Sequence, residues 1–474
     1  MIRVNNIHLS LDYDDKSVRK AVAQQLRIEE KSIKSCKIFR RSVDARKKDN
    51  IYFLTTVDAE LNINEDKVCK KCGNAQIARK YEYNQMKFGN APSPIVVGAG
   101  PAGLFAALIL ARSGANPILI ERGRDVDRRT ADVNRFWTSG QLDTTSNVQF
   151  GEGGAGTFSD GKLNSGTKDI RQRKVLEEFV SHGAPDEILY NAKPHIGTDM
   201  LKGTIKNIRN EIIELGGRVM FETKLVSMAF SDNKLKAITV KTKNGNEIIE
   251  TDNVILAIGH SARDTFEMLL AQGISMQPKA FAVGVRMEHP QSFINQNAYG
   301  DCHYKLPAAD YKVTFQTSTG KGVYSFCMCP GGYVVNASSE KERIAVNGMS
   351  YSGRNGDNAN SAIIVTVTPE DFGSNILDGM HFQRRLENLA WRDGNGKIPV
   401  QLYGDFKNNR ISTGFGAVTP SIKGAYTFGN LNRVLPEFLT APLKEGITGF
   451  STRIKGFDME EAVLSGVESR TSSP

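Results

Sequence analysis

A glycine-rich turn and one carboxylate have the most specific spacing for chemistry in this chain. The turn reads Gly98-Ala99-Gly100-Pro101-Ala102-Gly103, and Glu121 follows it. Gly98 permits a tight turn, Gly100 lets the backbone approach a pyrophosphate, and Gly103 lets a helix pack closely on a strand. The free N–H groups at the start of that helix attract phosphates. Glu121 can accept hydrogen bonds from a ribose diol and would repel a 2′-phosphate, so the spacing predicts a dinucleotide other than NADP.

The residues around this turn predict the strand–helix–strand unit that a dinucleotide site needs. Residues 95–97 are all apolar, which is typical of a buried parallel strand. Residues 104–113 are rich in Ala and Leu and predict a helix that ends at Gly114. Residues 118–120 predict the second strand, with Glu121 at its tip. Strand, helix, strand and acid therefore follow in the Rossmann order.

A second glycine-rich stretch covers residues 151–163. Residues 151–156 satisfy the same glycine pattern, but no strand–helix context surrounds them, so we expect no second Rossmann site there. So many glycines allow close approach to a flat or crowded group, which favours a loop wrapped around a cofactor ring over a flexible connector. The contacts expected from this loop are Gly153, Gly154, Gly156, Thr157, Ser159, Asp160 and Lys162.

Further cofactor contacts are expected from three places. Arg122 and Arg129 lie near the expected position of the phosphates and are candidates for charge neutralisation, although a solvated helix start explains them too. Leu225 belongs to a strand expected at 224–230. Ala257 and Gly259 belong to an apolar stretch, 254–259, that predicts a buried parallel strand ending at the cofactor.

Composition sets the class of the protein. The chain has 474 residues, of which 40% are hydrophobic and 24% charged, and its net charge is +9. Two or three globular domains are expected at this length. Six cysteines form no disulfide framework, and the pair Cys69 and Cys72 lacks the further ligands of a zinc site, so no metal is expected. Without a signal-peptide pattern or an apolar run long enough to span a bilayer, we expect a soluble cytoplasmic protein that does not contact a membrane.

The expected fold class is α/β, with a Rossmann-like domain on a parallel sheet, a mixed-sheet α+β substrate domain and a small N-terminal α+β domain. The helix expected at 16–26 and the strands at 2–11, 35–43 and 50–61 belong to the N-terminal domain. The second domain adds a helix at 200–215, and turn-rich stretches at 347–350 and 354–361 separate the strands of the third. The expected boundaries are 1–91, 92–279, 280–420 and 421–474.

Five segments spread over most of the chain resemble bacterial FAD-dependent dehydrogenases of unassigned function. These segments are residues 41–48, 151–163, 193–199, 326–332 and 468–474. The resemblance implies a glutathione-reductase-type FAD fold, preceded by a small α+β domain, with FAD in the main site. Similar proteins continue past the last segment into another glycine-rich strand and helix. Residues 421–474 are therefore expected to return towards the FAD domain and to stop short of that segment.

Candidates for chemistry beyond the flavin are few. Cys327 and Cys329 are two residues apart, so on a strand they would point the same way and face a flavin, unless they simply fill a strand core. His195 and His260 are candidate proton donors, with a structural role as the alternative. Glu468 and Arg470 are expected to form an ion pair.

These features favour an FAD-dependent oxidoreductase that acts on a small organic substrate. NAD(P)H is a candidate transient electron donor, and it would bind on the substrate domain. One alternative is a flavoprotein that binds or modifies RNA, suggested by the basic residues at 40–48. No aromatic residues are interleaved with them, so nucleic acid is not the expected partner. The other alternative is a non-catalytic FAD-binding protein.

Overall fold

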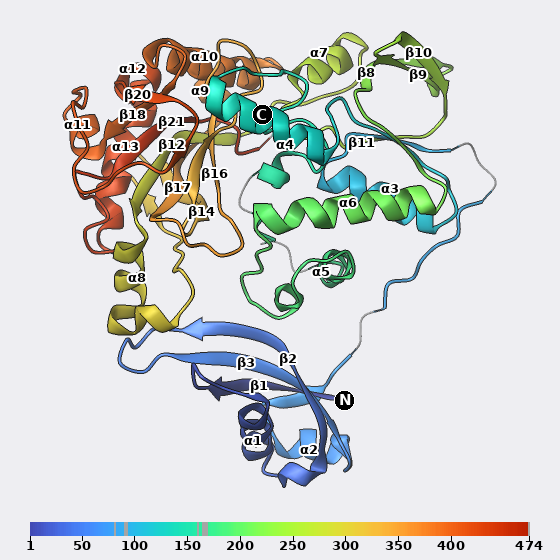
Figure 1. The fold of residues 1–474 in the computed structure, drawn as a ribbon, viewed down its shortest axis with the longest axis vertical. Coiled ribbons are helices and arrows are strands. Elements are labelled where there is room, and N and C mark those ends of the chain that lie inside the picture. The colour runs from blue at the N-terminus through green and yellow to red at the C-terminus, as the bar shows by residue number, and fades with distance from the viewer. Residues whose placement is uncertain (80–81, 90–92, 159–160, 164–168, 473–474) are drawn as a thin grey trace. The chain divides into compact units, whose positions relative to one another are not determined.

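The computed structural model describes residues 1–79, 82–89, 93–158, 161–163 and 169–472 (Figure 1). It contains two compact units. Unit 1 comprises Met1–Asn84, Lys162–Ile196 and Asn295–Ala309, and unit 2 comprises Gln85–Gly161, Gly197–Ile294 and Asp310–Pro474. The expected N-terminal domain contained only residues 1–91. The structure thus adds two later segments to it, and the sequence carries no local signal for that packing.

Unit 1 is built on a four-stranded antiparallel sheet with the order β2-β3-β1-β4. Its first elements, in chain order, are β1 (Ile2–Leu9), α1 (Asp15–Leu26), β2 (Ile33–Asp44), β3 (Tyr52–Leu61), α2 (Glu65–Lys71) and β4 (Ala75–Ile77). Alternate apolar residues of β1 pack against Val18, Val22 and Leu26 of α1, which confirms the expected helix. Helix α2 was not expected, because only Val68 of this charged helix is buried and no apolar periodicity marks it.

Unit 2 contains the expected parallel sheet, in the order β11-β5-β6-β7. These strands are β5 (Ile95–Val97), β6 (Ile118–Ile120), β7 (Arg218–Met220) and β11 (Val254–Leu256). Helices α3 (Pro101–Arg112) and α6 (Thr198–Glu214) lie side by side next to this sheet (Figure 1). An antiparallel three-stranded sheet follows β7, formed by β8 (Lys224–Ser231), β9 (Lys234–Thr242) and β10 (Gly245–Glu250).

One strand of the parallel sheet differs from its expected environment. The apolar stretch 254–259 predicted a buried strand, but β11 covers only its first three residues, and Ile255 and Leu256 are 41% and 39% exposed. The prediction of a buried strand was wrong because β11 lies at the edge of the sheet, with β5 as its partner. The apolar pattern alone does not distinguish an edge strand from a central one.

The second large sheet of unit 2 is mixed and has the order β13-β14-β17-β12-β21-β18-β20. Its strands are β12 (Phe281–Pro290), β13 (Thr314–Gln316), β14 (Gly322–Cys329), β17 (Asn358–Val367), β18 (Ile398–Leu402), β20 (Tyr426–Phe428) and β21 (Val463–Glu468). Helices α10 (Asp378–Asp393) and α13 (Glu437–Phe450) contribute to the apolar core that this sheet shares. The C-terminal strand β21 lies between β12 and β18, in the interior of the sheet.

Two stretches expected as turns are largely or partly strands. Residues 347–350 fall largely within β16 (Val346–Met349), and 358–361 begin β17. β16 forms a small sheet with β15 (Tyr333–Asn336) and β19 (Ile422–Lys423). The polar side chains Asn358, Asn360 and Ser361 are buried in β17, where other buried groups bond to them, so their polarity does not mark a loop.

The remaining helices connect or flank these sheets. They are α4 (Val126–Ser139), α5 (Gln172–Ser181), α7 (Arg263–Ala271), α8 (Gln291–Tyr299), α9 (Pro369–Phe372), α11 (Tyr403–Lys407) and α12 (Leu431–Val434). The short 3₁₀ turns are η1 (Glu30–Ser32), η2 (Ala155–Phe158), η3 (Asp186–Leu189) and η4 (Gly300–Lys305). Over the described part of the chain, every helix is too short or too polar to cross a membrane.

A buried carboxyl in β12 makes the stability of unit 2 depend on pH. Glu288 is fully buried, and burial raises its pKa to about 7, although its Oε1 accepts hydrogen bonds from Asn358 Nδ2 (3.1 Å) and Ser421 N (2.8 Å). A raised pKa in the folded state favours the protonated carboxyl. Its contribution to stability is therefore complete below the pKa of the unfolded chain and is lost as the pH rises through about 7.

We expect Glu288→Gln to remove this pH dependence. Between about pH 4 and about pH 8, the free energy of unfolding of the wild type should fall by about 3 kcal/mol relative to the variant. The free energy of unfolding at each pH is measured by urea unfolding, followed by the fluorescence of Trp137 and Trp391, both in unit 2. Glu370→Gln, at an exposed residue of α9, is the control and should follow the wild type. If the free energy of unfolding depended on pH in the same way in the wild type and in Glu288→Gln, the raised pKa of Glu288 would be contradicted.

Candidate functional site

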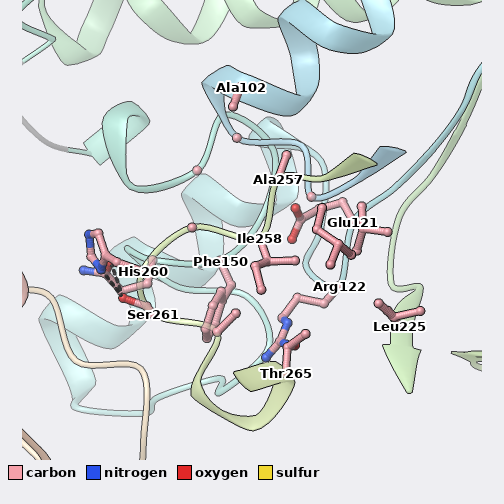
Figure 2. A pocket seen from close by; sticks show the side chains of 18 of the residues that line it. Ala102, Glu121, Arg122, Phe150, Leu225, Ala257, Ile258, His260, Ser261 and Thr265 are labelled. Carbon is pink, nitrogen blue, oxygen red and sulfur yellow. Dashed lines mark hydrogen bonds between the residues drawn. The ribbon is translucent and has the colours of Figure 1, made fainter. Parts of the chain in front are cut away.

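A cavity of about 600 Å³ opens at the carboxyl ends of the parallel strands. Val97, Ile120 and Leu256, the last residues of β5, β6 and β11, all line it. Open α/β sheets bind ligands at this edge. The cavity is also lined by the 98–102 turn, Glu121, Arg122, residues 149–150 and 154–156, the start of β8, and residues 257–262 (Figure 2).

The glycines of the turn have three different environments. Gly98 has a φ of +101°, and a Cβ there would lie 2.5 Å from the carbonyl oxygen of Ala257. A Cβ on Gly103 would overlap the carbonyl oxygen of Gly98. At Gly100 the nearest heavy atom to a Cβ is Gly154 Cα at 3.9 Å, so the space in front of this residue is open. Gly98 and Gly103 therefore build the turn, and Gly100 leaves room for a ligand.

Glu121 fastens three segments of the cavity wall. Its Oε2 accepts a hydrogen bond from Ala99 N (2.9 Å), and its Oε1 accepts from Gly123 N (2.9 Å) and Gly151 N (3.0 Å). A carboxylate offers about four acceptor positions, so about one is left for a hydroxyl group of a ligand. The same side chain thus holds the first turn against the second glycine-rich loop and faces the cavity (Figure 2).

These residues fit the ADP part of a flavin dinucleotide. The start of α3, directly after Gly100, carries backbone N–H groups that have no partner within the helix and favour a pyrophosphate. Gly154 opposite Gly100 leaves a cradle that a Cβ would narrow. Glu121 supplies the acceptor expected for a ribose hydroxyl.

The two expected arginines have other partners. The Arg129 side chain is fully buried and donates to the carbonyl oxygens of Asn147 (2.8 Å), Val148 (2.9 Å) and Glu152 (2.6 Å). It therefore holds the 147–152 loop and is not among the cavity-lining residues. Arg122 lines the cavity, but its guanidinium pairs with Asp264 (2.8 Å). Although burial opposes it, this pairing lowers the pKa of Asp264 to about 2.

The 151–163 loop contributes only part of what the sequence suggested. Gly154 and Gly156 line the cavity, together with Ala155 of the turn η2. Gly153 and Thr157 pack against each other, and the Thr157 hydroxyl donates to the Glu152 carbonyl, so they support the loop. Ser159 and Asp160 lie outside the described residues, and Lys162 belongs to unit 1. Leu225, Ala257 and Gly259 line the cavity, and their contact with a cofactor stays a prediction.

The expected catalytic residues are not gathered at this cavity. Cys327 and Cys329 are not among its lining residues. The register of β14 shifts between Phe326 and Cys329, and Cys327 has a φ of +45°, so regular strand alternation does not hold there. Cys329 is fully buried, with its Sγ 3.4 Å from Arg286 Nη2. His195 belongs to unit 1.

The predicted ion pair between Glu468 and Arg470 was wrong. Glu468 pairs with Arg286 of β12 at 3.0 Å, and Arg470 pairs with Glu387 of α10 at 2.9 Å. Both partners come from elements distant in sequence, and a third residue, Arg263 of α7, shares the Glu387 carboxylate at 2.7 Å. Local charge spacing therefore gave the wrong partner for each side chain.

Sequence reasoning named His260 as a candidate but missed Ser261, which lies next to it in the cavity wall. His260 and Ser261 line the cavity, as Figure 2 shows, and so does Gln149. The Ser261 hydroxyl donates to Gln149 Oε1 (3.0 Å), and Arg470 Nη1 reaches the Ser261 Oγ (3.4 Å). The available signal was their position directly after the end of a parallel strand, where polar residues of such folds meet ligands.

Three family models match parts of the chain. A model described as FAD binding domain matches residues 93–133, and one described as FAD-dependent protein, C-terminal domain-like, matches 280–471. A domain of unknown function matches residues 1–60.

Among solved structures, the chain is similar to Thermovibrio ammonificans THI4, at 15% identity and a TM-score of 0.27, over 39% of this chain and 64% of that one. It is similar to the flavin-dependent monooxygenase PieE in complex with FAD and substrate, at 15% identity and a TM-score of 0.31, over 59% of this chain and 43% of that one. The match to the tetracycline destructase Tet(51) has 14% identity and a TM-score of 0.30, over 64% and 63% of the two chains. The chain spans less than two thirds of each of these proteins.

An uncharacterised protein of Clostridium beijerinckii is 50% identical over 484 aligned positions, which cover 100% of this chain and 90% of that protein. Identity of this extent over the whole chain establishes common family membership. Two of the three models that match the chain describe FAD-dependent proteins. The chain therefore belongs to a family of FAD-dependent proteins that includes this Clostridium beijerinckii protein.

Proposed function

We propose that the chain is an FAD-dependent oxidoreductase of the dehydrogenase type, with a glutathione-reductase-type FAD site, and that it acts on a small organic substrate. The observation that supports this proposal is the composition of one cavity. It brings together the 98–102 turn, the ribose-type acid Glu121, the 154–156 loop and the polar pair His260 and Ser261.

Different residues of the cavity bind different parts of the cofactor. The backbone N–H groups at the start of α3 bind the pyrophosphate, and Glu121 binds the ribose. Leu225, Ile258 and Phe150 give the wall an apolar surface that excludes water from the bound molecule. When bound, FAD supplies the two-electron redox chemistry.

NAD(P)H is the proposed transient electron donor. The sequence has no second strand–helix fingerprint, so the donor binds without a Rossmann site of its own. We place the protein in the reducing cytoplasm. Among the described residues no disulfide joins two cysteines, which agrees with that compartment.

The visible spectrum of the purified chain tests the proposal. After incubation with FAD and gel filtration, we expect a yellow protein with bound oxidised flavin. Anaerobic titration with NADH, and separately with NADPH, should bleach it, and a suitable acceptor should restore the colour. A colourless protein after gel filtration would contradict the proposed FAD site. Bound flavin that neither nucleotide bleaches would remove only the nicotinamide donor.

A further inference from the structure

We propose that His260 presents an unprotonated Nε2 to the cavity and accepts a proton there from an O–H or N–H group of the substrate. The inference rests on the proposed function for the identity of the site. The position of the proton on the His260 ring is inferred from a network of hydrogen bonds. Gln149, Ser261 and His260 are the members of this hydrogen-bond network, and all three line the cavity. Figure 2 labels His260 and Ser261.

The hydrogen-bond network begins at Gln149, whose side-chain amide has a defined orientation. Its Nε2 donates to the carbonyl oxygen of Ala337 at 3.3 Å. The opposite orientation would place two acceptor oxygens against each other, which is unfavourable in a buried site. Gln149 is buried, so Oε1 is the atom that faces Ser261.

The next step fixes the single proton of Ser261. An amide oxygen can only accept, so the Ser261 hydroxyl donates to Gln149 Oε1 at 3.0 Å. The remaining partners of the Ser261 Oγ must then be donors. Arg470 Nη1 is one of them at 3.4 Å, and the other is His260 Nδ1 at 3.0 Å.

The last step fixes the tautomer of His260. Because Nδ1 must donate to Ser261, it carries the hydrogen, and a neutral imidazole then has its lone pair on Nε2. Among the described residues, the hydrogen bond to Ser261 is the one that His260 makes. Nε2 is therefore left for a bound molecule. The sequence suggested His260 as a proton donor, whereas this geometry makes it an acceptor.

The surroundings keep the imidazole neutral. Burial, followed by the positive charges of Arg470 and Arg263, lowers the pKa of His260 to about 4, and the Glu387 carboxylate opposes this only in part. Glu340, which pairs with Arg263, is the other acid of the cluster. At neutral pH the ring is thus available as a base.

The proton transfer is balanced within this pair of groups. The O–H or N–H bond of the substrate breaks, its electron pair stays on the oxygen or nitrogen, and the proton forms a new bond with the lone pair of Nε2. Alcohols and amines are the substrate classes that offer such a proton, and their oxidation by a flavoprotein requires its removal. Ser261 and Gln149 act as positioning residues.

Nitrogen NMR on protein labelled with ¹⁵N in its histidine rings tests the tautomer directly. We expect His260, assigned from the signal lost in His260→Gln, to show a protonated Nδ1 and an unprotonated Nε2 at neutral pH. Gln149→Leu frees the Ser261 proton to turn towards Nδ1, so the major tautomer should switch to Nε2–H. Ser261→Ala, which removes the acceptor, should also raise the Nε2–H population.

Ser412→Ala is the matched control, because Ser412 is another buried serine that accepts a backbone hydrogen bond, from Leu402 N at 2.8 Å. It should leave the His260 signals unchanged. A wild-type Nε2–H tautomer, or an unchanged tautomer in Gln149→Leu, would overturn the inference. Flavin retention is read separately from the visible spectrum. A colourless protein with the expected tautomer would therefore count against the proposed function and not against this arrangement of protons.

Discussion

We expect Glu387→Gln to lower the free energy of unfolding of unit 2 by about 3–5 kcal/mol. Glu387 lies in α10, and its carboxylate is fully buried. Its Oε1 accepts from Arg263 Nη2 (2.7 Å) and Arg470 Nε (2.9 Å), and its Oε2 accepts from Arg263 Nη1 (2.9 Å) and Arg470 Nη2 (2.9 Å). One carboxylate thus neutralises two guanidinium groups.

The size of the effect follows from what the substitution leaves behind. Glutamine has nearly the same shape, so the change removes charge and not volume. Arg263 and Arg470 would remain buried with less compensating charge, since Glu340 binds Arg263 but lies 3.9 Å from Arg470. Breaking a buried ion pair by removing one partner costs far more than breaking an exposed one. Arg470 donates to the Ser261 hydroxyl in the cavity wall, so the variant should also disturb flavin retention.

Urea unfolding followed by tryptophan fluorescence measures this loss, because Trp391 lies one helical turn after Glu387 in the same helix. Glu267→Gln is the control. This acid also pairs with an arginine, Arg384, but its side chain is 43% exposed, so a loss below about 1 kcal/mol is expected. Equal losses in the two variants would show that the burial of Glu387 does not determine its contribution.

The part of the site that the sequence could predict is the part whose geometry is local. Gly98, Gly100, Gly103 and Glu121 lie within one strand–helix–strand unit, and their types and spacing are required by the turn itself. The parallel sheet and the mixed sheet followed from apolar patterns in the same way.

The rest depended on contacts between distant segments. Arg129 was expected at phosphates but binds the carbonyl oxygens of a loop, and the edge position of β11 is decided by the strand order. Glu468 forms an ion pair with a residue of β12, and Arg470 forms one with a residue of α10. Nothing in the local sequence specifies such partners, because a charge pattern records which residues are charged and not which elements pack together.

We expect Gly103→Ala to weaken the binding of FAD by about 5- to 100-fold, so that less flavin is retained after gel filtration. A Cβ at this position would overlap the carbonyl oxygen of Gly98 and would lie 3.4 Å from the Cβ of Ala257. Backbone cannot yield as a flexible side chain can, so α3 must move away from the turn. Overpacking of this kind costs about 1–3 kcal/mol or more, and every 1.4 kcal/mol changes affinity about tenfold.

Gly203→Ala is the control for Gly103→Ala: it makes the same glycine-to-alanine change, but we expect it to stabilise the protein and to leave flavin binding intact. Gly203 lies in the interior of α6, and a Cβ there would have no heavy atom within 4 Å. Alanine in an unhindered helix position is favoured over glycine by about 0.5–1 kcal/mol, so this variant should be more stable and should retain flavin. Absorbance of bound flavin after gel filtration and urea unfolding measure both variants. Flavin retention by Gly103→Ala equal to that of Gly203→Ala would contradict the close helix–turn contact on which the FAD site depends.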